Sequence, residues 1–326
     1  MSDSPLLQVR DLERYYGNLH AVRGVSFDVS RGEILGFLGP NGAGKSTTMQ
    51  ILAGVLSASK GEVSVDGINL ASDAGAAKAR IGYLPERPPL YADMSVDEFL
   101  RFAARLRGVE GSQLSDSVAN AKERCGLATF GRRIIKNLSK GYQQRVGIAQ
   151  AIVHRPDLII LDEPSSGLDP NQIREIRALI RDLGEGQSVL LSTHILAEVQ
   201  TLCDRVVIIN QGQIVHDEMV SPDGRDDART HTVRVRQPFP TDIAVALEGV
   251  EAVSAQNDLT YLVRHDGRTS TTDALVKLSV SCGLVEFVPS ASSLEDLFVA
   301  LTLGKTDHAK PDDAPYQVNR GDGATC

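Results

Sequence analysis

The stretch GPNGAGKST, residues 39–47, decides the fold of this chain. It fits the pattern G-x-x-x-x-G-K-[ST], which Gly44, Lys45 and Ser46 complete. An apolar run, ILGFL, precedes the stretch, and a helical pattern, STTMQILAG, begins at Ser46. Glycines at these positions let the backbone curl, so that its N–H groups face an anion at the positive end of the following helix. The pattern therefore predicts a strand, a phosphate-binding loop and a helix, in that order.

This loop predicts a site for the phosphates of a nucleotide. Lys45 is expected to supply positive charge to the β and γ phosphates, and the Ser46 hydroxyl to take a place on Mg²⁺. A flexible turn with a solvent-exposed lysine is the alternative, which the flanking strand and helix disfavour. The residues expected to contact the nucleotide here are Gly39, Asn41, Gly42, Gly44, Lys45, Ser46 and Thr47.

A second apolar run, LIILDEP, ends in two acids, Asp162 and Glu163. Parallel α/β sheets bind ligands at the C-terminal ends of their strands. Asp162 is therefore expected to hold the metal, usually through water, and Glu163 to orient or deprotonate the attacking water. A charged strand end that caps the next loop is the alternative. His194 follows another apolar run, LLST, so its ring is expected at the same sheet edge, within reach of the γ phosphate.

Short apolar runs alternate with helical patterns, which is typical of a largely parallel sheet with crossover helices. The expected buried strands are EILGFLG, DLIILDEP, SVLLST and RVVIIN. The runs VSFDV and GEVSVDGINL alternate instead, with Asp66-Gly67 as a tight turn, so a small antiparallel sheet is expected to flank the parallel one. From about Ser95 to Leu138 the pattern is helical throughout, beginning with a capping box between Ser95 and Glu98.

The chain is expected to divide into two domains. Apolar periodicity is lost between residues 216 and 231, where Pro, Gly and charged residues predominate. The expected parts are an α/β nucleotide-binding domain at 1–220 with a helical subdomain at about 87–140, a linker at 221–230, a small α+β domain at 231–303 and a disordered tail at 304–326.

The second domain shows a βαββαβ order with an additional final helix, which suggests a ferredoxin-like unit. Its first and last strands are expected at TVRVRQ and LVEFVPS, with a hairpin across Asn257-Asp258 between them in the chain. The helices are expected at DIAVALEG, TTDALVKLSVSCG and SLEDLFVALT.

The 34 Lys and Arg against 42 Asp and Glu give a formal net charge of −8, which argues against a general nucleic-acid binder. The N-terminus lacks the apolar segment of a secretory signal, and no window approaches the roughly 18 uninterrupted apolar residues of a bilayer span. A cytosolic, soluble chain is therefore expected. Its four cysteines lie far apart without metal-ligand spacing, so reduced thiols are expected.

Five motifs in a fixed order make the chain from about Leu6 to Glu218 resemble the ATP-binding subunit of an ABC transporter. GPNGAGKST is similar to Walker A, LSKGYQQR to the ABC signature, LIILDEP to Walker B, SSGLDP to the D-loop and STH to the switch histidine. The resemblance implies a P-loop NTPase fold of the ABC type that binds and hydrolyses ATP with Mg²⁺.

In this family two such domains sandwich two ATP molecules head to tail, so the resemblance implies a partner, either a second copy or a similar ATPase subunit. Ser139 and Gly141 of the signature would then bind the γ phosphate held by the partner, again at a helix N-terminus. Tyr16 corresponds to the aromatic residue that stacks on adenine; the adjacent Tyr15 and an ordinary packed tyrosine are the alternatives. Asp169 matches the D-loop acid that couples the two composite sites.

Two positions depart from the family pattern. Where relatives have LSGGQ, residues 138–142 read LSKGY, which keeps the serine and the second glycine. Where the Q-loop usually carries Gln, GYLPERPPLY places Glu86. Its carboxylate can still meet Mg²⁺ or water, but it adds negative charge beside the triphosphate and loses an amide donor. The hydrolysis rate and its dependence on a membrane partner are thereby left open.

YLPERPPLY and SKGYQQR, with the C-terminal domain, resemble the ABC-2 type branch, which includes gliding-motility-associated and drug or polysaccharide exporters. This resemblance implies a separate integral membrane permease docked on the helical insertion, and a cytoplasmic place at the inner face of the cell membrane. No nucleic-acid partner is expected.

Two other functions compete with transport. A soluble ABC ATPase acting on ribosomes or DNA is disfavoured by the single phosphate loop. An ATP-binding regulatory module with little turnover is suggested by Glu86 and disfavoured by Glu163 and His194. For the second domain, packing and dimer support are favoured over ligand sensing.

Overall fold

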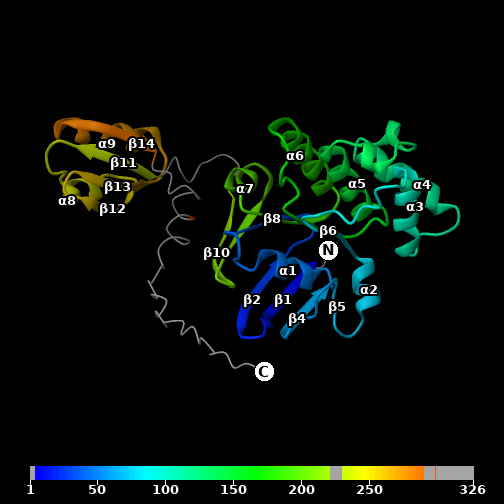
Figure 1. Ribbon diagram of the computed structural model, residues 1–326. Helices are drawn as coiled ribbons and strands as arrows, with labels where there is room; N and C mark the ends of the chain where they lie inside the picture. The colour runs from blue at the N-terminus through cyan, green and yellow to red at the C-terminus, as the bar shows by residue number, and fades with distance from the viewer. Residues whose placement is uncertain (1–3, 221–229, 290–297, 299–326) are drawn as a thin grey trace, which may run out of the picture.

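The computed structural model describes residues 4–220, 230–289 and 298 (Figure 1). Its central element is a sheet in the strand order β10-β9-β3-β8-β7-β6, in which only β10 runs antiparallel to its neighbour. The strands are β3 (Ile34–Leu38), β6 (Ile81–Leu84), β7 (Leu158–Asp162), β8 (Ser188–Thr193), β9 (Arg205–Asn210) and β10 (Gln213–Met219). Every residue of β3, β7 and β8 is buried, as expected for parallel strands covered on both faces.

The four expected parallel strands are present, whereas β6 and β10 were not expected. β6 has only four residues and runs directly into Pro85. β10 is an edge strand whose sequence, QIVHDEM, is mostly polar because one side faces solvent. The apolar periodicity is therefore lost from His216 to Met219 because these residues form an exposed strand. The expected domain boundary can begin only after Met219.

An antiparallel sheet of order β2-β1-β4-β5 covers one side of the central strands (Figure 1). Its strands are β1 (Leu7–Tyr16), β2 (Leu19–Val29), β4 (Lys60–Val65) and β5 (Ile68–Asn69). Asp66 and Gly67 form the expected turn, with φ values of 53° and 76° that suit a two-residue hairpin. Helix α1 (Lys45–Leu52) contributes Met49 to the core between the two sheets.

The helical insertion begins with the expected capping box. Ser95 N donates to Glu98 Oε2 over 2.8 Å, and Glu98 N donates back to Ser95 Oγ over 3.3 Å. The insertion is not helical throughout, because Gly126 with φ 66° ends a helix and only 3₁₀ turns follow it before Ser139. Its elements are α3 (Val96–Leu106), α4 (Gln113–Arg124), η1 (Ala128–Phe130), η2 (Ile135–Asn137) and α5 (Lys140–Ile152).

Three more helices complete this part of the chain, namely α2 (Ala74–Ala79), α6 (Pro170–Gly184) and α7 (Leu196–Leu202). Residues of α3, α5, α6 and α7 share one apolar core with the central sheet. None of the helices in the described residues combines the length and apolarity that crossing a membrane requires. The described cysteines, Cys125, Cys203 and Cys282, are free, as expected.

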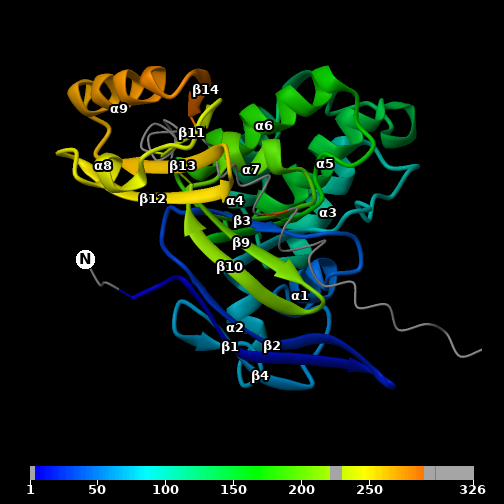
Figure 2. The same cartoon turned by 90° about the vertical axis from the view of Figure 1, so that its left-hand side faces the viewer.

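The C-terminal elements form a separate antiparallel sheet of order β12-β13-β11-β14 with a core of its own, seen in yellow and orange in Figures 1 and 2. The elements are β11 (Thr230–Val235), α8 (Thr241–Val245), β12 (Val250–Asn257), β13 (Thr260–His265), α9 (Thr269–Ser281) and β14 (Leu284–Pro289). This order and connectivity are those of a ferredoxin-like unit, as expected.

Two details of this unit differ from expectation. The hairpin turn falls on Asp258 and Leu259, because Asn257 still pairs with Thr260. Helix α8 ends at Val245, well before the expected end at residue 249. The expected linker, tail and final helix lie outside the described residues, apart from Thr230 and from Phe298, a helical residue packed against the core of the central sheet.

Candidate nucleotide site

The loop between β3 and α1 is shaped by its glycines. Gly39 follows the buried strand β3, and Gly44 is the N-cap of α1 with φ 105°. A Cβ atom at Gly44 would lie 2.7 Å from the carbonyl oxygen of Ala21, so a side chain at this position is excluded both by conformation and by space. The loop therefore presents the N-terminus of α1, with its free N–H groups, at the sheet edge.

Lys45 is a buried cation, with 6% of its surface exposed. Its Nζ donates to the carbonyl oxygens of Gly39 over 2.9 Å and Pro40 over 3.3 Å. It also lies 3.3 Å from Oε1 of Glu163, at the end of β7. The solvated surface lysine considered as the alternative is thereby excluded.

Glu163, at the end of β7, contacts both helix α1 and the end of β8. Its φ of 50° lies in the left-handed region, which is rare for a residue with a side chain and marks a constrained turn. Its N–H donates to the carbonyl of Ser192 on β8, over 3.0 Å. Its Oε2 lies 2.8 Å from Nδ1 of His194, so Glu163 is held between Lys45 and His194. Residues far apart in the sequence thus meet at one sheet edge.

Asp162 lies beneath this group and is almost fully buried, with 1% of its surface exposed. Its Oδ1 accepts hydrogen bonds from Ser46 Oγ over 3.2 Å and from Ser192 Oγ over 2.8 Å. Burial raises the pKa of this carboxyl, and the two hydroxyl donors offset part of that rise. Ser192 was not anticipated; its only signal is a polar residue inside the apolar run SVLLST.

These oxygens fit a magnesium ion. Mg²⁺ is usually held by one or two protein oxygens together with substrate phosphates and water, and Ser46 and Asp162 offer such a pair. A cation beside Asp162 would also offset the cost of burying its charge. The described residues contain no cluster of three or more His, Cys, Asp or Glu side chains suited to a metal. Because Mg²⁺ takes further oxygens from phosphates, the Ser46 and Asp162 pair suits a metal that arrives with a nucleotide.

A cavity of about 480 Å³ opens beside these groups. It is lined by Tyr16, Leu19, Ala21, Asn41, Gly42, Gly44, Lys45, Ser46, Thr47, Glu86, Glu163, Ser166 and His194. Leu19, Ala21 and Ser166 were not anticipated, because nothing in their local sequence marks them. Most of the expected contact residues are thus brought together, whereas Gly39 and Asp162 lie behind the lining.

Tyr16, and not Tyr15, lines the cavity. Tyr15 stacks on His20 with ring centroids 4.0 Å apart and donates its hydroxyl proton to Glu13 over 2.7 Å. Tyr16 is 44% exposed, and the guanidinium carbon of Arg14 lies 4.9 Å from its ring centroid.

Ser139, Gly141 and Asp169 do not line this cavity. Ser139 is the N-cap of α5, and Asp169 is the N-cap of α6, where its carboxylate accepts from the N–H groups of Asn171 and Gln172 over 2.9 and 3.0 Å. Gly141 is buried against the side chain of Gln172, so the two helix starts lie side by side.

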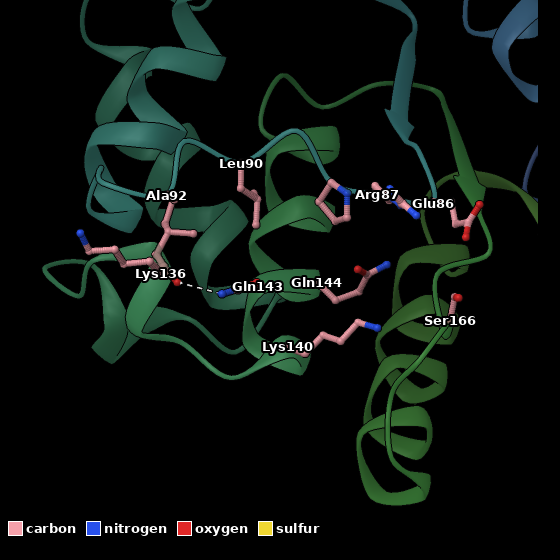
Figure 3. Close-up of a pocket in the computed structure, with 11 residues that line it drawn as sticks. Glu86, Arg87, Leu90, Ala92, Lys136, Lys140, Gln143, Gln144 and Ser166 are labelled. Atoms are coloured by element: carbon pink, nitrogen blue, oxygen red, sulfur yellow. Dashed lines mark hydrogen bonds between the residues drawn. The ribbon is translucent and has the colours of Figure 1, made fainter.

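A second cavity, of about 550 Å³, adjoins the first and shares Glu86 and Ser166 with it (Figure 3). Figure 3 shows Lys140 and Gln144 of α5 directed toward Ser166 across this cavity. Arg87 and Lys136 add positive charge to its lining. Glu86 and Lys140, two of the residues that depart from the family pattern, therefore line one cavity.

Comparison with known proteins agrees with this geometry. The family model described as ABC transporter matches residues 22–166. The uncharacterized ABC transporter ATP-binding protein YdbJ of Bacillus subtilis is 34% identical over 301 residues, which cover 91% of this chain and 96% of YdbJ. The bacitracin transport ATP-binding protein BcrA of Bacillus licheniformis is 33% identical over 318 residues, covering 93% of this chain and 99% of BcrA.

A solved structure described as the ATP binding subunit of an ABC transporter is 33% identical and superposes with a TM-score of 0.60, over 68% of this chain and 92% of that structure. The expected fold class, a phosphate-loop ATPase of the ABC type with mixed sheets and a helical insertion, is confirmed. The chain therefore belongs to the ABC transporter ATP-binding proteins, the ATP-hydrolysing subunits of these transporters.

Proposed function

We propose that this chain binds Mg²⁺-ATP in the cavity beside Lys45, hydrolyses it, and so powers a separate membrane permease of the ABC-2 type in an export system. The proposal rests mainly on one observation. Lys45 and His194 both lie within ion-pair or hydrogen-bond distance of Glu163 at one edge of the sheet. The similarity to BcrA, a protein named for bacitracin transport, supports a drug or antibiotic as the exported class.

Each residue of the site has a separate task in this proposal. Lys45 carries the positive charge that holds the β and γ phosphates, and the N-terminal N–H groups of α1 add to it. Glu163 accepts the proton of the attacking water. His194 is hydrogen-bonded to Glu163 and contacts the γ phosphate. Ser46 and Asp162 would hold Mg²⁺, which when bound neutralises charge on the phosphates.

The assembly proposed is a head-to-tail dimer with a second copy or a similar ATPase subunit. Ser139, Gly141 and Asp169 lie outside the chain's own cavity, at the starts of α5 and α6. The start of α5 offers free N–H groups to an anion. We assign Ser139 and Gly141 to the ATP of the partner, and Asp169 to the contact between the two sites.

The permease is proposed to dock on the helical insertion beside the second cavity, which places the chain on the cytoplasmic face of the cell membrane. That cavity extends from Glu86, which also lines the nucleotide cavity, to Lys136 on the insertion. It therefore connects the nucleotide site with the proposed docking surface. The separate core of the C-terminal sheet supports a division into domains at 1–220 and 231–303. We assign packing and dimer support to the second domain.

The test of the permease is copurification. The tagged chain is extracted from membranes in mild detergent, and its partners are identified by mass spectrometry. Recovery of a multi-span membrane protein is the expected result, and its sequence would indicate the cargo. Recovery only from the soluble fraction, with ribosomal or DNA-associated partners, would leave the ATPase assignment intact and contradict transport.

Tyr16→Ala is expected to raise the KM for ATP about tenfold with little change in kcat, because the exposed ring is the adenine platform. Tyr15→Ala is the matched control and should leave KM nearly unchanged, since that ring is engaged by His20. Steady-state ATPase assays over a range of ATP concentrations measure both. An effect confined to Tyr15→Ala would reverse the assignment.

Glu86→Gln is expected to lower the KM for ATP about fivefold at saturating Mg²⁺, because it removes a negative charge from the cavity wall while keeping an oxygen ligand. The decrease in KM should be smaller at high ionic strength, since Glu86 is exposed and salt screens its charge. Glu62→Gln, an exposed acid outside the cavity lining, is the control. An increased Mg²⁺ requirement at unchanged KM would instead identify Glu86 as a metal ligand.

A further inference from the structure

Glu198 is a buried acid outside both cavities. It lies in the first turn of α7 with 1% of its surface exposed. A buried carboxylate is costly unless its charge is paired and hydrogen-bonded, so its place in the fold needs specific partners. None of the roles assigned above uses this residue.

The first partner of Glu198 is Thr193, the residue directly before His194. The Thr193 hydroxyl donates to Glu198 Oε2 over 2.7 Å, in a fully buried contact. The same hydroxyl oxygen accepts the N–H of Ile195 over 3.0 Å. The residues on both sides of His194 are therefore joined at the Thr193 hydroxyl, which Glu198 holds in turn. The His194 side chain is 46% exposed and its ring hydrogen-bonds to Glu163.

The second partner lies on α6. Arg177 Nη2 is 3.6 Å from Glu198 Oε1, close enough for an ion pair but beyond hydrogen-bond distance. Further along the same helix, Arg181 donates to the carbonyl of Thr201 on α7, over 2.8 Å. Helix α6 begins at Asp169. One helix therefore connects the proposed dimer contact to the carboxylate that anchors the His194 loop.

We propose that Glu198 is a positioning residue for His194, which fixes the turn at the end of β8 through Thr193 and sets its place relative to α6 through Arg177. The proposal rests on the role proposed for His194 at the γ phosphate and extends it. A loop with an exposed imidazole needs such an anchor, because displacing a catalytic group by a fraction of an ångström is enough to slow a reaction. Movement of α6 at the dimer contact would then reach His194 by way of Arg177 and Glu198.

The kinetic test compares ATP hydrolysis by the full chain and by Glu198→Gln, which keeps the side-chain shape and removes the charge. The expected result is a fall in kcat of about tenfold at nearly unchanged KM for ATP. In a His194→Ala background the same substitution should have almost no further effect, because both changes disable one unit. Glu185→Gln, an exposed acid just beyond α6, is the control and should retain full activity. If Glu198→Gln lowered kcat by the same factor in the His194→Ala background as in the wild type, the two residues would act independently and the proposal would be overturned.

A second measurement is independent of ATP. The histidine side-chain NMR signals of the chain, with that of His194 assigned from its absence in His194→Ala, report the position of the ring directly. Glu198→Gln is expected to shift and broaden the His194 signal, and Glu185→Gln to leave it in place. If Glu198→Gln fails to fold, Thr193→Val removes the same hydrogen bond, with Thr193→Ser as the variant that restores it. An unmoved His194 signal in a folded variant would refute positioning even if the ATPase assignment holds.

Discussion

The Glu163→Gln variant is expected to bind ATP and to hydrolyse it about a thousandfold more slowly than the wild type. An amide cannot accept the proton of the attacking water, yet it fills the same space between Lys45 and His194. The substitution also removes a negative charge beside the phosphates, so the ATP-bound state should persist. The protein is expected to elute as a dimer from a sizing column with Mg²⁺-ATP, and single-turnover assays measure the rate.

Two outcomes would contradict this prediction in different ways. A Glu163→Gln protein that binds ATP but stays monomeric at high protein concentration would contradict the head-to-tail dimer. A rate close to the wild type would show that another group accepts the proton. Glu185→Gln serves again as the matched control, since it is exposed and outside the cavity lining.

Lys45→Met is expected to weaken ATP binding by roughly two to three orders of magnitude, since truncating one partner of a buried charge pair costs about 2–5 kcal/mol. The apolar side chain keeps most of the stem of Lys45 but loses the ammonium that contacts Gly39, Pro40 and Glu163. Without the ammonium, the carboxylate of Glu163 opposes the approach of further negative charge. Titration with a fluorescent ATP analogue measures the loss.

Lys60→Met is the control for this experiment, because Lys60 is 68% exposed on β4 and outside the cavity lining. It should bind the analogue as the wild type does. If Lys45→Met retained an affinity within a factor of two of the wild type, the cavity beside Lys45 would not be the phosphate site. A melting curve of each variant separates lost binding from lost structure.

The sequence was sufficient to predict the meeting of Lys45, Glu163 and His194. Parallel strands end at the same edge, so residues that follow buried apolar runs are brought together by the fold itself. Ser192 and Glu198 could not be found in this way. Their roles depend on contacts with residues distant in the sequence, since Ser192 bonds Asp162 on β7 and Glu198 pairs with Arg177 on α6.

The secondary structure was predicted best where the chain is covered on both faces. The runs of β3, β7 and β8 are apolar throughout, whereas β10 presents charged residues to solvent and resembles a loop in sequence. The choice between Tyr15 and Tyr16 needed the structure as well. Both rings have the same chemistry, and only the neighbours His20 and Glu13 show that Tyr15 is already engaged.

The wall between the two cavities consists in part of Glu86 and Ser166, which face both sides. A molecule that moves these side chains from one side changes the energy of binding on the other, and thermodynamic linkage makes that effect mutual. If a permease segment seated beside Lys140 tightens ATP binding by some factor, ATP must tighten the hold on the permease by the same factor. With such a wall, the affinity for the permease would depend directly on whether ATP is bound in the first cavity.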